Sequence, residues 1–183
     1  IAVLVIDVKE GLTDQDKRIA QIAIDAGKGL ILAVNKWDLI ENKESNTINK
    51  FTKDIRNEAP FLDFAPIVFI SAKTGQRIHK IFSMADEIHA QANKSISTSL
   101  LNRVVLEAFA LNPPTTEKGK RLKSYYSTQI TTAPPSFVLF VNDPELMKDS
   151  YKRYLEKKLR EAFGFFGTPI RILTRERKEK KSK

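Results

Sequence analysis

Two short motifs in the first half of the sequence carry side chains suited to recognising guanine. The first is Asn-Lys-Trp-Asp at positions 35–38, and the second is Ser-Ala-Lys at positions 71–73. Guanine presents two N–H donors on one edge, and a single carboxylate can accept both in a bidentate pair that adenine does not offer. Asp38 is therefore the candidate for the contact that decides which base is bound.

The other motif residues have supporting roles in such a pocket. Asn35 can brace the loop and approach the base edge, Lys36 can lay its aliphatic stem over the ring, and the backbone N–H of Ala72 can donate to guanine O6. Trp37, the only tryptophan, would then report binding by its fluorescence. The predicted guanine-binding residues are Asn35, Lys36, Asp38, Ser71, Ala72 and Lys73.

The alternation of elements in the first 92 residues predicts how these motifs are positioned. Apolar runs at 1–6, 30–34 and 67–70 alternate with helical patterns at 14–26, 47–58 and 76–92. Continuous apolar strands separated by helices indicate a parallel sheet with helices on both faces. Ligands bind at the carboxyl ends of strands in such sheets, and each motif directly follows a strand. Taken alone, Asn-Lys-x-Asp could be a chance turn after a strand, and it is the second motif after its own strand that favours a guanine site.

The helix predicted at 14–26 has signals at both ends. Thr13, with Asp16 three residues later, predicts a capping box at its start, and Gly27 predicts its end. The apolar positions that we expect to form its buried face are Ile19, Ile22, Ala23 and Ala26.

A shift to small polar residues at 93–99 predicts a domain boundary at Ser95. Beyond it, apolar residues recur at helical spacing over 100–109, and a turn-rich stretch at 112–123 reads as an exposed basic loop. Strands at 125–131 and 137–141, a helix at 150–163 and a strand at 169–173 complete an α-β-β-α-β order. The predicted domains are 1–94 and 95–174, with a basic disordered tail at 175–183.

The charge of the chain is concentrated in the second part. Residues 1–94 carry 13 basic and 13 acidic side chains, whereas residues 95–183 carry 18 and 9. Such an excess attracts polyanions, and unpaired bases can stack on Tyr125 and Tyr126. The helix lysines could equally form a solvated face. The candidates for RNA contact are Lys118, Lys120, Arg121, Lys123, Lys152, Arg153, Lys157 and Arg160.

The two guanine motifs make residues 1–92 similar to the last half of a Ras-like P-loop G domain of the bacterial type. The whole chain resembles the double-G-domain GTPase family called Der or EngA, and this implies a second G domain followed by a KH-like domain. The motifs of the second domain that carry the resemblance are Ser-Leu-Leu-Asn at 99–102, Asn-Pro-Pro at 112–114, 119–123, 126–129, 134–137, Phe-Val-Asn at 140–142, 153–155, 159–160 and 164–170.

The resemblance also implies a function and its partners. Members of the family bind GTP and GDP and associate with the large ribosomal subunit during its assembly. The implied partners are that subunit with its ribosomal RNA and the other G domain of the same protein, and we expect neither membrane nor DNA as a partner. A non-catalytic RNA-binding or interdomain packing module is the alternative.

Motifs for phosphate chemistry are missing from this sequence. It contains no Gly-x-x-x-x-Gly-Lys-Ser/Thr, the loop that cradles phosphates and supplies a hydroxyl to Mg²⁺, so we expect no GTP hydrolysis by this chain alone. Mg²⁺ would act only in the full-length parent. The run from Asp7 to Gly11 is one residue too long for a Mg²⁺-linked Asp-x-x-Gly, and we interpret it as a surface turn. Because the sequence begins inside a predicted strand, we expect a longer protein.

The segment Gly-Phe-Phe-Gly at 164–167 has the spelling of the RNA clamp of KH domains. It lies between the last helix and the last strand instead of between two helices, and its middle residues are large and apolar. A helix cap followed by a turn, with both phenylalanines packed inward, is the simpler interpretation.

Composition narrows the remaining classes. Cysteine is absent, and His79 and His89 are isolated, so neither disulfides nor a metal site are expected. The apolar runs fall far short of the roughly 20 residues of a membrane helix, and no secretory signal is evident. The expected setting is the bacterial cytoplasm.

Overall fold

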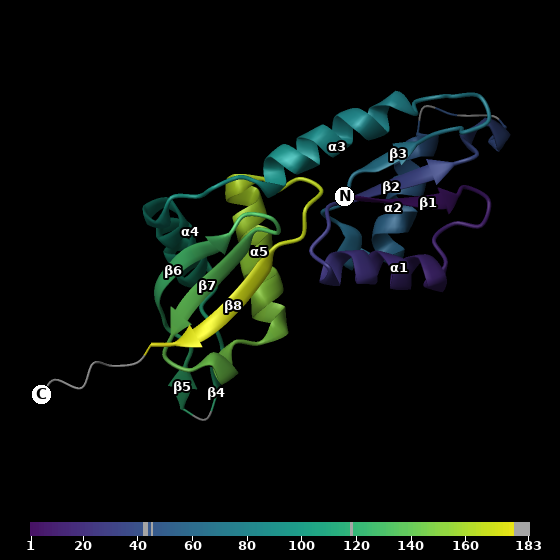
Figure 1. Cartoon of the computed structure of the whole chain (residues 1–183). Coiled ribbons are helices and arrows are strands. Elements are labelled where there is room, and N and C mark those ends of the chain that lie inside the picture. Colours follow the sequence, from purple (N-terminus) through teal and green to yellow (C-terminus); the bar gives the residue numbers. More distant parts are fainter. Residues whose placement is uncertain (42–43, 45, 118, 178–183) are drawn as a thin grey trace, which may run out of the picture. The chain divides into compact units, whose positions relative to one another are not determined.

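The computed structural model describes residues 1–41, 44, 46–117 and 119–177, and it is drawn in Figure 1. The chain forms two units. The first contains Ile1–Ala92 together with Phe165–Pro169, and the second contains Asn93–Gly164 together with Ile170–Lys183. The predicted α/β class is confirmed, because a three-stranded parallel sheet with helices is followed by a second, mixed three-stranded sheet with its own helices.

The first unit is built on strands β1 (Ala2–Asp7), β2 (Leu30–Asn35) and β3 (Ile67–Phe69). They pair in parallel in the order β1-β2-β3, with Asp7 opposite Asn35 and Val34 opposite Phe69. The central strand β2 is almost wholly buried, as expected for a strand covered on both faces. This register aligns the carboxyl ends of the strands at one edge of the sheet.

Helices cover both faces of this sheet (Figure 1). Alternate β-strand residues such as Leu4, Leu32 and Val34 pack in one core with α1 (Asp14–Asp25) and α2 (Thr47–Glu58). Ile31 and Ala33 point to the other face and pack with α3 (His79–Ala92). Short 3-10 turns, η1 (Trp37–Leu39) and η2 (Pro60–Leu62), follow β2 and precede β3.

Helix α1 starts as predicted but presents another face to the core. Thr13 and Asp16 form the capping box, and Gly27 follows the helix with a positive φ of 70°. The expected apolar face is confirmed for Ala23, which packs against the core, but it was wrong for Ile19 and Ile22, which are 48% and 68% exposed whereas Ala20 is buried. Ala20 lies on the helix face that packs against the sheet, because its small side chain lets the helix backbone approach the strands.

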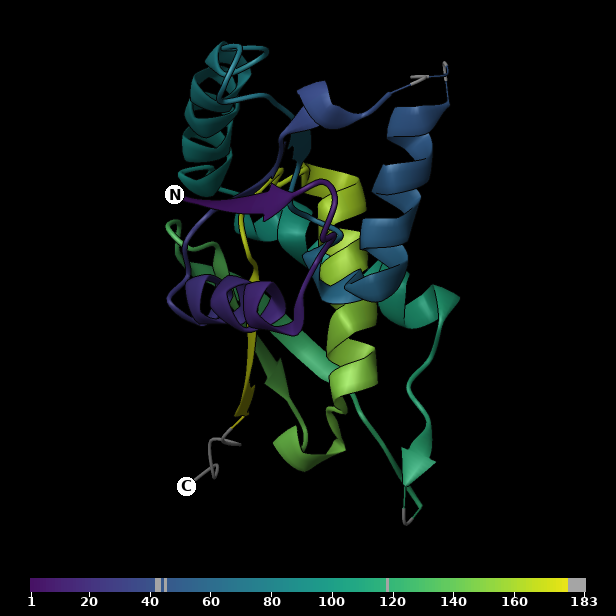
Figure 2. The same ribbon diagram turned by 90° about the vertical axis from the view of Figure 1, so that its right-hand side faces the viewer.

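The second unit begins with α4 (Thr98–Leu111) and has a sheet of three strands: β6 (Ser124–Thr131), β7 (Ser136–Val141) and β8 (Arg171–Glu176). Strand β7 is central, antiparallel to β6 and parallel to β8. Between β7 and β8 lie η3 (Pro144–Leu146) and α5 (Asp149–Phe163). Helices α4 and α5 lie on one side of this sheet, and among the described residues of the second unit no helix covers its other face (Figures 1 and 2).

Two expectations for the second unit need correction. The loop expected at 112–123 contains a short hairpin, β4 (Thr116–Glu117) and β5 (Lys120–Arg121), and Leu122 next to it is buried. Pro114 in the same segment is buried as well, so apolar residues near both ends of the segment pack against the unit. The tail expected at 175–183 starts too early, because β8 runs to Glu176 and pairs with β7 up to that residue. Residues 178–183 lie outside the described part.

Amide side chains fasten the ends and edges of the second unit. Asn102 of α4 accepts from the N–H of Ser127 at 2.7 Å and donates to its carbonyl at 2.9 Å, so it satisfies the outer edge of β6. Gln129 accepts from Ile96 N–H at 2.7 Å. Asn142 accepts from Lys123 N–H at 2.7 Å and donates to the Arg121 carbonyl at 3.0 Å. Each of these side-chain amides bonds to backbone N–H or carbonyl groups that have no neighbouring strand to pair with.

The Gly-Phe-Phe-Gly segment is a turn with packed phenylalanines, as interpreted from the sequence, but the core that it joins is that of the first unit. Phe165 is fully buried, and Phe166 packs beside Ile31 and Ile88. The Gly167 carbonyl accepts from Leu30 N–H at 2.8 Å, and its N–H donates to the Phe64 carbonyl at 3.0 Å. A segment near the end of the chain is therefore part of the first unit.

In the part of the chain that the structure describes, every helix is too short or too polar to cross a membrane.

Candidate guanine site and candidate RNA-binding residues

The two predicted guanine loops meet at the carboxyl ends of neighbouring strands. Ile70 N–H donates to the Val34 carbonyl at 2.8 Å, and Trp37 N–H donates to the Ile70 carbonyl at 3.0 Å. These bonds continue the pairing of β2 and β3 for one step beyond the strands. The backbone of one loop therefore sets the position of the other.

Side chains of the two motifs also bond to one another. Asn35 Oδ1 accepts from the N–H of Ala72 at 2.9 Å, and the Ser71 hydroxyl donates to Asp38 Oδ1 at 2.6 Å. Ser71 is buried and its oxygen also accepts from Thr74 N–H at 3.2 Å. The bond from the Ser71 hydroxyl fixes the orientation of the Asp38 carboxylate, because a short bond to a buried hydroxyl restricts rotation of the carboxylate.

These contacts refine the predicted roles. The N–H of Ala72, expected to donate to guanine O6, is paired with Asn35 in the structure. Two roles were predicted for Asn35, bracing the loop and approaching the base edge, and in the structure its side chain braces one loop against the other. Lys73 is exposed. If guanine O6 accepts from the Ala72 N–H, it either shares this N–H with Asn35 Oδ1 or replaces Asn35 as the acceptor.

Lys36 is held by a residue that the motif analysis did not assign to the site. Its backbone has a positive φ of 63°, and its ammonium lies 2.6 Å from the Asp7 carboxylate at the end of β1. The hydrogen bond from Lys36 lowers the pKa of Asp7, and the same bond raises the pKa of Lys36. Asp7 does begin a surface turn, as interpreted. The signal that identifies it is the pairing of β1 with β2, which puts Asp7 opposite Asn35.

Trp37 does not line the base site. Its side chain is 2% exposed and packs against Phe51 and Phe69, with ring centroids 5.6 Å and 4.7 Å away. The expectation that its fluorescence would report occupancy directly is not supported by this position. Residues that follow a strand point alternately in and out, so Trp37 completes the core while its neighbours face the ligand edge. Its fluorescence therefore reports on the packing of the first unit.

The predicted RNA contacts on α5 divide into paired and exposed side chains. Lys152 lies 3.7 Å from Asp149, and Arg160 lies 2.9 Å from Glu156, both as neighbours along the helix. Arg153 and Lys157 are exposed. The helix buries Leu155, Leu159 and Phe163, so its basic residues form the solvated face that the alternative described.

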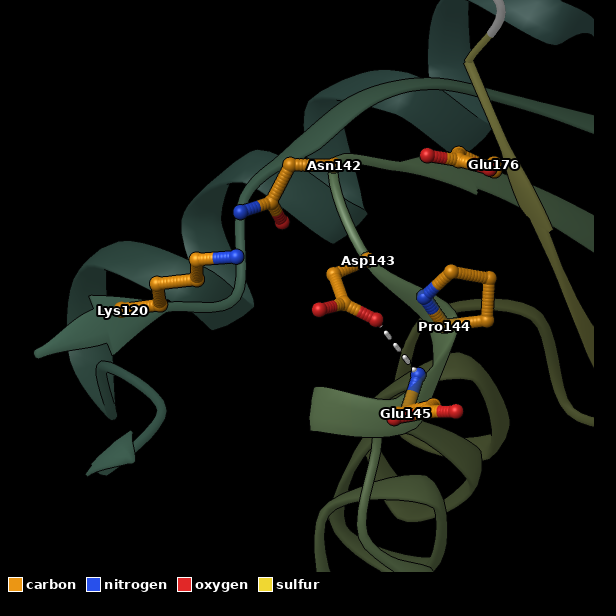
Figure 3. Close-up of a pocket in the computed structure, with 6 residues that line it drawn as sticks. All are labelled: Lys120, Asn142, Asp143, Pro144, Glu145 and Glu176. Atoms are coloured by element: carbon orange, nitrogen blue, oxygen red, sulfur yellow. Dashed lines mark hydrogen bonds between the residues drawn. The ribbon is translucent and has the colours of Figure 1, made fainter. Parts of the chain in front are cut away.

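The hairpin residues Lys120, Arg121 and Lys123 are also exposed, whereas Lys118 lies outside the described residues. Figure 3 shows Lys120 beside a pocket whose other lining includes the carboxylates of Asp143, Glu145 and Glu176. Asp143 caps η3 by accepting from Glu145 N–H at 3.0 Å. Three carboxylates beside one lysine repel a phosphate, so this pocket does not favour an anion. Within the described residues no cluster suited to a metal ion occurs.

Tyr125 and Tyr126 do not lie beside the basic residues of α5. Tyr126 is opposite Phe140 in the β6–β7 ladder, on the face of the sheet that carries no helix. Both tyrosines are about half exposed, at 47% and 46%. Tyr126 therefore lies on the opposite side of the sheet from the α5 candidates.

Comparison with known proteins matches two different families to two parts of the chain. Residues 1–91 match the family described as the elongation factor Tu GTP binding domain, and residues 95–175 match the KH-domain-like, C-terminal domain of EngA bacterial GTPase enzymes. Three similar curated proteins are each called GTPase Der. The protein from Natranaerobius thermophilus is 54% identical over 175 residues, which are 96% of this chain and 40% of that protein.

Further relatives show the same coverage. GTPase Der from Desulfitobacterium hafniense is 51% identical over 181 residues, or 99% of this chain and 41% of the relative. The protein from Listeria monocytogenes is 51% identical over 178 residues, or 97% and 41%. The chain thus spans about two fifths of the curated relatives that it matches. Its two matched parts and its similarity along nearly the whole length show that the chain belongs to the Der (EngA) family of GTPases.

Proposed function

We propose that this chain recognises the guanine of GTP and GDP within a longer factor that binds and hydrolyses GTP during assembly of the large ribosomal subunit. The observation that carries the proposal is the direct bonding of the two motif loops, Asn35 to Ala72 and Ser71 to Asp38. A pocket whose side chains are fixed before the ligand arrives loses little entropy on binding.

Each residue has a defined part in this recognition. Asp38 accepts N1–H and N2–H of guanine, and Ser71 keeps its carboxylate turned toward the base. The stem of Lys36 covers one side of the ring while its ammonium is held by Asp7. Asn35 keeps the second loop in place through Ala72. The base is thereby distinguished from adenine, which presents an acceptor at N1.

Phosphate binding, the Mg²⁺ contact and hydrolysis need residues beyond this sequence, which has no phosphate-cradling loop motif. The contribution of the chain to the GTPase is therefore base recognition. In the full-length protein this site would anchor the nucleotide while the other residues act on its phosphates.

The test is nucleotide binding by the full-length protein that carries this chain. Asp38→Ala removes both acceptors, so we expect the dissociation constants of GTP and GDP to rise by about a hundredfold or more, since hydrogen bonds to a charged group contribute about 1.5–3 kcal/mol each. Asp14→Ala is the control, because Asp14 is exposed and pairs only with Lys17 on the surface of α1 among its described ion pairs. Equal losses in both variants, or unchanged affinity in Asp38→Ala, would overturn the proposal.

For the second unit we propose contact with ribosomal RNA of the large subunit. The excess of 18 basic over 9 acidic residues beyond position 94 supports this role. Docking onto a neighbouring G domain of the same protein is the second candidate, because the family resemblance implies such a domain. Binding of the 183-residue chain to large-subunit RNA and to duplex DNA, each measured over a range of salt, distinguishes them. RNA binding that persists at physiological salt supports the RNA role, and equal binding that vanishes with salt supports docking.

A further inference from the structure

The face of the β6–β7–β8 sheet that carries no helix has an ordered set of side chains. Strand register places three rows across it, and each row takes one residue from each strand. We call this surface the open sheet face. Its rows are Tyr126–Phe140–Arg175, Thr128–Val138–Leu173 and Thr131–Ser136–Arg171.

The assignment of these rows to one face rests on burial and pairing. The alternate rows contain Phe137, Leu139 and Ser127, and the backbone of Ser127 is bonded by Asn102 of α4. Val138 in the centre of the open sheet face is only 1% exposed, whereas Tyr126 and Leu173 on either side of β7 are each 46% exposed. In β8 the exposure alternates, with Arg171, Leu173 and Arg175 more exposed than the residues between them. Figure 1 shows this face with α4 and α5 behind it.

Aromatic rings lie next to cationic side chains on the open sheet face. The ring centroids of Tyr126 and Phe140 are 6.0 Å apart, and Arg175 follows in the same row. At the margin, the guanidinium of Arg177 lies 4.9 Å from the ring centroid of Tyr125. The three rows contain no acidic residue, since the neighbouring Glu176 belongs to an alternate row opposite Val141.

We propose that the open sheet face binds unpaired RNA, with bases stacked on Tyr126 and on the exposed part of Phe140 and with phosphates held by Arg171 and Arg175. Exposed aromatic rings and guanidinium planes stack on base faces, which are accessible only where the bases are unpaired. A duplex offers no such faces. This inference rests on the proposed RNA role of the second unit and specifies the surface and the form of the RNA.

The charge pattern favours RNA over a protein partner. Arg171 and Arg175 lie on the same side of β8 with Leu173 between them, and Arg177 follows two residues after Arg175, so positive charge runs along the strand beside the rings. This linear spacing of positive charge is complementary to a backbone with repeated phosphates. The cores of protein interfaces, in contrast, are depleted of charged residues.

The experiment measures binding of the 183-residue chain to a labelled single-stranded RNA and to an RNA duplex of the same length at physiological salt. We expect Tyr126→Ala to weaken single-strand binding roughly five- to hundredfold, the range found for loss of one base stack. Tyr126→Phe keeps the ring and should restore most of the affinity. Arg175→Ala should lower the salt slope of binding by about 0.7, whereas Arg175→Lys should keep it.

The competing candidate surface on α5 is tested by Lys157→Ala, which removes an exposed basic side chain from the predicted RNA candidates. The proposal is overturned if Lys157→Ala weakens RNA binding while Tyr126→Ala does not, or if duplex and single strand bind equally. In those cases the broader RNA role would stand. Failure of the unsubstituted chain to bind any RNA would remove both proposals. Loss of binding to a neighbouring G domain in Tyr126→Ala, with RNA binding unchanged, would assign the face to protein docking.

Discussion

The predicted guanine loops of the first unit and the RNA candidates of the second unit are built in different ways. In the first unit a few side chains bond directly to one another, as Asn35 does to Ala72 and Ser71 to Asp38. In the second unit the candidate groups are surface residues that strand register brings together, such as Tyr126 and Arg175. Side chains that bond to one another within two short motifs can be recognised from the sequence. Side chains that are brought together by strand pairing can be recognised only once the sheet is known.

This difference predicts a sharp response to substitution in the first unit. Asp38→Asn replaces one carboxylate oxygen by an amide donor, which suits xanthine because xanthine carries a carbonyl where guanine carries an amino group. In the full-length protein we expect guanine nucleotide affinity to fall by about a hundredfold or more and xanthine nucleotide affinity to rise. Competition binding with both nucleotides measures this exchange. A loss of both affinities would show that Asp38 supports the loop and does not contact the base.

The next prediction concerns the segment that the first unit takes from the end of the chain. A Cβ at Gly167 would lie 2.3 Å from a carbon of Ile88, and the residue has a φ of +65°. Gly11→Ala is the matched control, because Gly11 has a φ of +73° and open space around it. We expect Gly167→Ala to lower the free energy of unfolding by about 1–3 kcal/mol more than the control, the usual cost of overpacking.

Unfolding followed by the fluorescence of the buried Trp37 measures the stability of the first unit in these two variants. Equal destabilisation by both would mean that Ile88 moves aside without cost. It would also weaken the assignment of Phe165–Pro169 to the first unit.

A smaller effect is expected in the second unit, where one amide satisfies a strand edge. Asn102→Ala leaves the N–H and carbonyl of Ser127 without their side-chain partner, which costs about 1–3 kcal/mol for partly buried groups. Asn142→Ala, at an exposed hairpin, should cost less. Hydrogen exchange of the Ser127 amide should accelerate only in Asn102→Ala. Unchanged exchange there would show that β7 alone protects the edge strand.

The smallest effect is expected for the ion pair that holds Lys36. The pKa of Asp7 is lowered from its ordinary value of 3.8, so the pair stabilises the fold above that pH and its contribution is lost as the pH falls through the lower folded pKa. Asp7→Asn should therefore change stability only slightly and by a constant amount at neutral pH. A carboxyl NMR titration of Asp7 checks this. A pKa at or above 3.8 would contradict the bond to Lys36.

Several features followed from local sequence because local chemistry decides them. The capping box at Thr13, the parallel strands and the helix at Thr47–Glu58 are examples, since caps and apolar periodicity act over a few residues. The closeness of the two guanine loops followed from strand order, because parallel strands end at one edge. The helical face of α1 did not, since Ile19 and Ala20 are both apolar and only the sheet selects between them.

From local sequence followed the fold class, which the structure confirms, and the two candidate sites, which stay predictions, because short motifs and apolar periods lie in neighbouring residues. Tertiary packing alone places Trp37 in the core, Asp7 beside Lys36 and Phe165 in the first unit. It also decided that Tyr126 lies in a row with Arg175, almost 50 residues away in the chain. The physical reason is that burial and strand register join residues far apart in sequence, and no local pattern records that pairing.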